Sequence, residues 1–171
     1  MALLFIHGAG AYGRARPIAD ALGAALGVPV RLPRLPDDDM SLDRWAERIR
    51  DALDALEPPD VVVAHSFGAS VLLQVLADRT RPLPRRAVLL AMPDWSADGW
   101  GVQEYAFDGP EPAQALSLHH CRDDEIVPFS HLASNVSRLP SATVHPHDTG
   151  GHWFDGLTAA IVADLRGELT G

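Results

Sequence analysis

Short apolar runs alternate with longer stretches in which apolar and polar residues recur at helical spacing. The short runs predict six strands, at 2–6, 28–32, 60–65, 87–92, 115–120 and 142–145. The longer stretches predict helices at 16–26, 42–56, 69–77, 130–137 and 155–169. Strands that alternate with helices are typical of an α/β fold. We therefore expect a three-layer αβα sandwich with a mainly parallel sheet of about six strands.

The stretch 93–114 does not fit this alternation. It is irregular, rich in glycine and proline, and holds four of the eleven aromatic residues, which are Trp95, Trp100, Tyr105 and Phe107. Irregular segments of this length in compact domains are usually lids or binding loops. We interpret it as a small cap-like segment whose aromatic side chains, Trp95 and Trp100 among them, line a substrate pocket. The alternative is a surface loop whose aromatic side chains pack onto the core.

Composition narrows the class of protein. The 171 residues suit a single domain, 1–171, and the net charge of −9 disfavours nucleic acid or an anionic membrane surface as a partner. All 14 basic residues are arginine, which together with abundant alanine, proline and glycine favours a GC-rich bacterial coding sequence. The single cysteine fits a reducing compartment. The apolar run at 2–6 is too short for a signal peptide or a membrane span, so we expect a cytoplasmic protein.

A candidate nucleophile lies at the junction of the third strand and the following helix. Only a sharp turn fits between them, and Ser66 occupies it within the sequence Ala-His-Ser-Phe-Gly at 64–68. A serine on such a turn presents its hydroxyl clear of the backbone, as in the G-x-S-x-G nucleophile elbow. Ala64 replaces the first glycine of that motif. The alternative for these five residues alone is an ordinary helix start.

The polar residues that could assist Ser66 also follow predicted strands. In parallel sheets, ligands bind beyond the carboxyl ends of the strands, so residues after different strands share one edge. His7, Asp123, Asp124 and His152 all lie at such positions. A serine hydroxyl needs a base within hydrogen-bond reach, and the base needs an anion to orient it. His152 and one of the two aspartates can supply both.

At these residues the chain resembles the α/β-hydrolase superfamily. The segment 124–128 resembles the D-x-x-V-P segment that follows the acid-bearing strand, 150–153 resembles the G-H segment of the catalytic histidine, and 7–10 resembles the H-G-x turn. The order Ser, Asp, His is also the order of that fold. The resemblance implies that Ser66, Asp124 and His152 form a catalytic triad, with Asp123 as the alternative acid. It also implies an oxyanion hole made by the backbone N–H groups of Ala9 and Phe67.

The resemblance covers nearly the whole chain and is strongest to the compact YdeN-like serine hydrolases, a group that includes the retinoblastoma-binding serine hydrolase of animals. It implies a serine hydrolase that cleaves a small-molecule ester, thioester or amide and needs no cofactor. The two strands that usually precede the H-G strand are missing from this sequence. Two alternatives remain: a non-catalytic protein-binding module on the same fold, and a cofactor-free acyltransferase or perhydrolase.

The remaining histidines allow other roles. We expect His65 and Trp153 to line the substrate pocket and His7 to brace its loop. An H-x-H-D-x-x-x-H run, formed by His145, His147, Asp148 and His152, contains zinc-binding residue types. The run lies on one loop and would leave the Ser66 turn unexplained, so we expect no metal in the active site.

Overall fold

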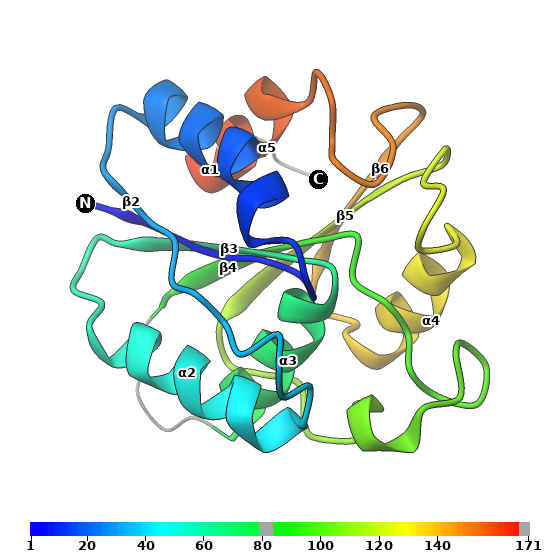
Figure 1. Ribbon diagram of the computed structural model, residues 1–171. Coiled ribbons are helices and arrows are strands. Elements are labelled where there is room, and N and C mark those ends of the chain that lie inside the picture. The colour runs from blue at the N-terminus through cyan, green and yellow to red at the C-terminus, as the bar shows by residue number, and fades with distance from the viewer. Residues whose placement is uncertain (79–83, 168–171) are drawn as a thin grey trace.

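The computed structural model, which describes residues 1–78 and 84–167, contains one six-stranded sheet (Figure 1). All neighbouring strands run parallel, in the order β2-β1-β3-β4-β5-β6. The strands are β1 (Leu3–Ile6), β2 (Val30–Arg31), β3 (Val61–His65), β4 (Arg86–Leu90), β5 (Ala115–Cys121) and β6 (Thr143–His147). The predicted α/β class and six-stranded parallel sheet are therefore confirmed.

Helices cover both faces of this sheet because successive side chains of a strand point to opposite faces. Leu3 and Phe5 of β1 pack into one core with α1 (Tyr12–Leu26) and α5 (Thr158–Leu165). Leu4 and Ile6 pack into the other core, which lies beneath α2 (Leu42–Asp54), α3 (Phe67–Ala77) and α4 (Ser130–Arg138). The two helical layers are seen on opposite sides of the sheet in Figure 1.

Two helices begin three or four residues away from their predicted starts, and the starts of the others agree to within two residues. Helix α1 begins at Tyr12, four residues before the expected start, so that Pro17 lies inside the helix. Helix α5 begins at Thr158 instead of 155, because Phe154 and Gly156 adopt left-handed backbone angles that a helix cannot contain. Its described part ends at Leu165. The expected helical positions 168 and 169 lie outside the described residues.

The carboxyl edge of the sheet collects the loops that carry the candidate site. Helix α3 begins directly after β3, Asp124 follows β5, and His152 follows β6. The segment 93–114 follows β4 and contains a single 3-10 turn, η1 (Gln103–Tyr105). Among the described residues, no helix is both long and apolar enough to cross a bilayer.

Candidate active site

Ser66 occupies a strained turn between β3 and α3. Its backbone has φ 54° and ψ −127°, a conformation that non-glycine residues rarely adopt. The Ser66 N–H donates to the Leu90 carbonyl at 2.8 Å, which holds the turn against β4. A Cβ on Gly68 would lie 2.2 Å from the His7 carbonyl oxygen, so only glycine lets α3 approach the loop after β1. Ala64, in the place of the motif's first glycine, is fully buried in β3.

Asp124 and His152 form a close pair beside this turn. The Nδ1–H group of His152 donates to both carboxylate oxygens of Asp124, at 2.9 and 3.1 Å. The backbone N–H groups of Ile126 and Val127 donate to the same carboxylate, each at 2.8 Å. Burial by itself raises the pKa of Asp124, but hydrogen bonds from His120, His152 and these amides outweigh it and hold the pKa well below its ordinary value. The aspartate is therefore ionised and accepts the Nδ1–H of His152, which leaves the Nε2 atom of the neutral imidazole as its acceptor.

His120 places a second imidazole next to Asp124. This histidine was not predicted from the sequence to belong to the site. Its Nε2–H group donates to the Val127 carbonyl at 3.0 Å and lies 3.4 Å from Asp124 Oδ2. Both side chains are fully buried. The available signal was the period of two in β5, which turns His119 and His120 to opposite faces. It does not identify which of the two meets the carboxylate.

The neighbouring carboxylates shape the loop that carries His152. Asp123 accepts hydrogen bonds from the backbone N–H groups of Gly150 and Gly151, at 3.2 and 2.8 Å. Glu125 accepts one from the backbone N–H of His152 at 3.3 Å. Asp124 is therefore the carboxylate that contacts the imidazole, whereas Asp123 holds the turn before it.

His65 links the strand before Ser66 to the His152 loop. Its Nε2–H group donates to the His152 carbonyl at 2.8 Å, and its ring lies 4.9 Å from that of Trp153. Burial, with a smaller contribution from His152, lowers the pKa of His65 to about 3. The ring is therefore neutral. His7 braces the adjacent loop, because its Nε2 atom accepts a hydrogen bond from the Leu35 N–H at 3.2 Å.

A cavity of about 280 Å³ opens beside Ser66 and His152. All four predicted pocket residues line it, namely His65, Trp95, Trp100 and Trp153, as do Ala9 and Phe67. Tyr105, another aromatic residue of 93–114, lines it too, and so do Met40 and Ile126, which were not predicted from the sequence. Among the described residues, the backbone N–H groups of Ala9 and Phe67 have no hydrogen-bond partner, and Ser66 makes no hydrogen bond to His152. Catalytic hydrogen bonds are often long in unliganded enzymes and shorten when substrate binds.

The segment 93–114 forms one wall of this cavity. The indole Nε1–H of Trp95 donates to the Ser70 hydroxyl at 2.8 Å, and the Tyr105 hydroxyl donates to the Met40 carbonyl at 3.0 Å. Both rings also contact Phe67 edge to face, with centroids 5.7 and 4.8 Å away. Trp95 and Tyr105 thus pack onto the core and also line the cavity, whereas Phe107 packs onto the core without lining this cavity.

The H-x-H-D-x-x-x-H run near the C-terminus does not bring its side chains together in one zinc site. His145 lies in β6, whereas His152 faces Asp124. The exposed Asp148 pairs with Arg122 at 3.4 Å. These side chains therefore belong to separate contacts.

Comparison with known proteins identifies a family that matches this sequence. The family described as Serine hydrolase matches residues 14–156. No curated protein sequence is significantly similar to the chain. Among solved structures, the ydeN gene product of B. subtilis is 23% identical with a TM-score of 0.75, covering 97% of this chain and 96% of its own. Mouse alpha/beta hydrolase domain-containing protein 10 is 15% identical with a TM-score of 0.72, covering 99% and 90%.

A third solved structure contains a bound ligand. It is Est1E from Butyrivibrio proteoclasticus with ferulic acid, which is 14% identical with a TM-score of 0.68 and covers 98% of this chain and 88% of its own. At these identities, the structural matches support the α/β-hydrolase fold, and the family match covers most of the chain. The expected resemblance is confirmed: the chain belongs to the serine hydrolase family.

Proposed function

We propose that the protein hydrolyses a small ester, thioester or amide through an acyl-enzyme formed on Ser66. The observation that carries this proposal is the shared cavity. Its wall contains both Ser66 on a strained turn and His152, whose Nδ1–H is held by the buried Asp124. That tautomer directs the basic Nε2 lone pair away from the carboxylate.

The reaction follows from these positions. Ser66 Oγ attacks the acyl carbon while His152 Nε2 accepts the hydroxyl proton, and Asp124 stabilises the imidazolium that forms. The unpartnered N–H groups of Ala9 and Phe67 hold the negative charge that develops on the carbonyl oxygen. His152 then donates its proton to the leaving group. A water molecule, deprotonated by the same imidazole, hydrolyses the acyl-enzyme and restores Ser66.

The cavity favours a compact apolar acyl or aryl group. Its volume lies near the lower limit for small-molecule pockets. Trp95, Trp100 and Trp153 supply flat apolar walls, on which an aromatic ring would stack. Est1E, whose structure contains ferulic acid, has the same fold. Short acyl esters and aryl-substituted acids are therefore the first substrates to test.

A fluorophosphonate probe tests the nucleophile directly. The wild-type protein should be labelled at one site, identified as Ser66 by peptide mass spectrometry. Ser66→Ala should resist labelling and retain the circular dichroism spectrum and melting temperature of the wild type. A folded wild-type protein that resists the probe would contradict the proposal and favour a protein-binding module.

The substrate class can be narrowed with two parallel series. One series contains p-nitrophenyl esters of increasing acyl length, and the other contains matched thioesters and arylamides. We expect kcat/KM to be highest for short or aromatic acyl groups and to fall for long chains that exceed the cavity. A steady rise with chain length would contradict the proposed compact pocket.

A further inference from the structure

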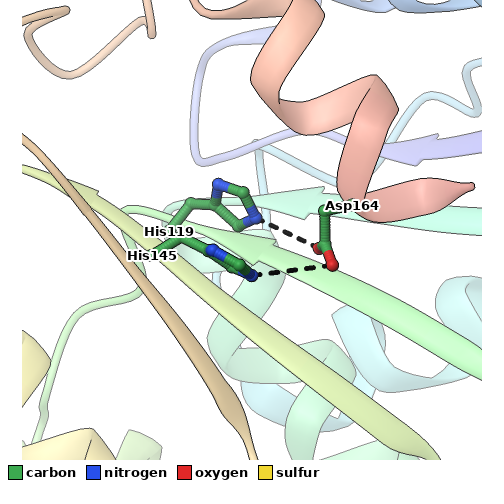
Figure 2. A group of neighbouring side chains, drawn as sticks. All are labelled: His119, His145 and Asp164. Atoms are coloured by element: carbon green, nitrogen blue, oxygen red, sulfur yellow. Dashed lines mark hydrogen bonds and ion pairs between the residues drawn. The ribbon is translucent and has the colours of Figure 1, made fainter. Parts of the chain in front are cut away.

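A second group of histidines and an aspartate lies away from Ser66. Figure 2 shows His119 from β5, His145 from β6 and Asp164 from α5, with both imidazoles directed at the carboxylate. Asp164 and His119 are fully buried, and the side chain of His145 is 14% exposed. The group lies on the face of the sheet covered by α1 and α5, whereas His120 turns to the other face and meets Asp124.

The distances in this group suit a shared metal ion. His119 Nε2 lies 3.1 Å from Asp164 Oδ2, and His145 Nε2 lies 3.6 Å from Asp164 Oδ1. One ligand atom from each residue fits within a span of 4.8 Å. Tetrahedral zinc bound at 2.0–2.1 Å places its ligand atoms roughly 3.3–3.4 Å apart. The separation of each imidazole from the carboxylate is thus close to that around one zinc ion.

His145 Nε2 is one of several buried side-chain atoms that have no hydrogen-bond partner among the described residues, and it reaches Asp164 Oδ1 only at 3.6 Å. It is inaccessible to solvent and makes no hydrogen bond. A buried polar atom without a partner is unfavourable, so its position calls for a physical reason. Coordination of a cation would satisfy its lone pair at the place where it already points.

Neighbouring residues can orient the ligands from outside. His119 Nδ1 lies 3.0 Å from His147 Nε2, so a hydrogen bond donated from Nδ1 leaves the Nε2 lone pair of His119 available. The Arg86 guanidinium donates to Asp164 Oδ1 at 2.8 Å and leaves Oδ2 for an ion. Because Arg86 is cationic, it should make this site weaker than one with the same ligands and no neighbouring charge.

We propose that His119, His145 and Asp164 bind one divalent transition-metal ion, with zinc as the preferred class and water at the remaining position. Two imidazoles and a carboxylate suit zinc, whereas magnesium and calcium prefer oxygen ligands. The ion would join α5 to the two strands at the edge of the sheet. This site lies outside the Ser66 cavity and does not depend on the proposed hydrolase activity.

Zinc titration of the full-length, chelator-treated protein tests this site. Calorimetry should show one saturable site in the wild type. At free zinc about a hundredfold above Kd, the melting temperature should rise by about 5–10 °C. The key variant is His145→Gln, because its Nε2 atom has no hydrogen bond to lose and the fold should persist. This variant should bind zinc more than about a hundredfold more weakly and lose the zinc-dependent rise in Tm.

Two further variants test whether zinc binding is independent of Ser66 and whether it depends on His147, the neighbour of His119. Ser66→Ala should bind zinc as the wild type does. His147→Phe keeps the ring but removes the acceptor, so it should weaken binding by about ten- to a hundredfold. With cobalt as the probe, the wild type should show visible d–d absorption that His145→Gln lacks. No saturable binding, or equal binding by His145→Gln, would overturn the proposal. Loss of binding in His152→Ala but not in His145→Gln would do the same.

Discussion

Two aspartates in this protein each meet histidines, yet their surroundings differ. Asp124 holds His152 at the rim of a cavity that also contains Ser66. Asp164 holds a histidine pair beneath α5 and also pairs with Arg86 at 2.8 Å. The first cluster has an open side where a substrate can enter. The second is enclosed between a helix and two strands.

This difference shows that the same residue types acquire their chemistry from what lies next to them. At Asp124, backbone amides and two imidazoles stabilise the carboxylate, and the proposed base keeps one nitrogen toward the cavity. At Asp164, a guanidinium occupies one carboxylate oxygen, and no strained serine lies near it among the described residues. The first arrangement favours proton transfer, and the second favours a fixed structural contact or ion binding.

The largest expected effect separates the two aspartates by activity. Asp124→Asn should lower kcat/KM for a p-nitrophenyl ester by about 10⁴-fold, because the amide favours the wrong imidazole tautomer. Asp164→Asn should stay within about threefold of the wild type at a temperature where both are folded. Asp123→Asn is the matched control beside the triad, and it should lose far less than Asp124→Asn. Equal losses in Asp124→Asn and Asp164→Asn would remove the distinction between the clusters.

The second expected effect concerns stability. Asp164→Asn removes a buried charge from its contacts with Arg86 and His119. Because Arg86 is partly exposed, the loss should be smaller than for a fully buried ion pair, about 2–3 kcal/mol of unfolding free energy. Urea unfolding followed by circular dichroism measures it. A change under about 0.5 kcal/mol would show that this cluster does not fasten α5 to the sheet.

A third effect is a loss of stability in acid. Burial lowers the pKa of His65 to about 3, below the ordinary value of 6.5 in the unfolded chain. Below pH 6.5 the unfolded state binds a proton that the folded state does not. His65 therefore contributes full stability above pH 6.5 and loses it as the pH falls toward 3, by up to about 1.4 kcal/mol per pH unit.

The variant His65→Gln isolates that contribution. Glutamine can still donate a hydrogen bond to the His152 carbonyl but does not titrate. Urea unfolding between pH 8 and pH 4 should give a shallower decline for the variant than for the wild type. If the free energy of unfolding falls equally with pH in both proteins, His65 takes up a proton in the folded state as readily as in the unfolded chain.

The smallest expected effect lies at the wall of the cavity. Trp100 is 40% exposed, so its removal should cost only part of a full aromatic contact. Trp100→Ala should raise KM for aryl esters by about three- to tenfold and leave kcat nearly unchanged. Short acetyl esters provide the control, because they should not reach this ring. A fall in kcat for both classes would instead indicate that Trp100 positions the proposed triad.

Local patterns explain why much of this protein could be predicted. Each strand and helix is encoded within a short window by its apolar spacing, and the alternation of the two implies parallel pairing. The turn at Ser66 is readable because a strand, a small residue and a helix meet there. The choice of Asp124 over Asp123 came from the resemblance to a family segment, and the contact with His152 at 2.9 Å agrees with it. The catalytic roles themselves stay predictions.

Other features depend on contacts between distant parts of the chain. The period of two in β5 places His119 and His120 on opposite faces, but it does not say what each one meets. Asp164 lies 45 positions after His119, on a helix that begins three residues later than its spacing predicts because left-handed residues precede it. Met40 and Ile126, which also line the cavity, likewise lie on separate loops. Periodicity encodes which face a side chain takes, whereas only the packing of helices and loops onto the sheet decides its partners.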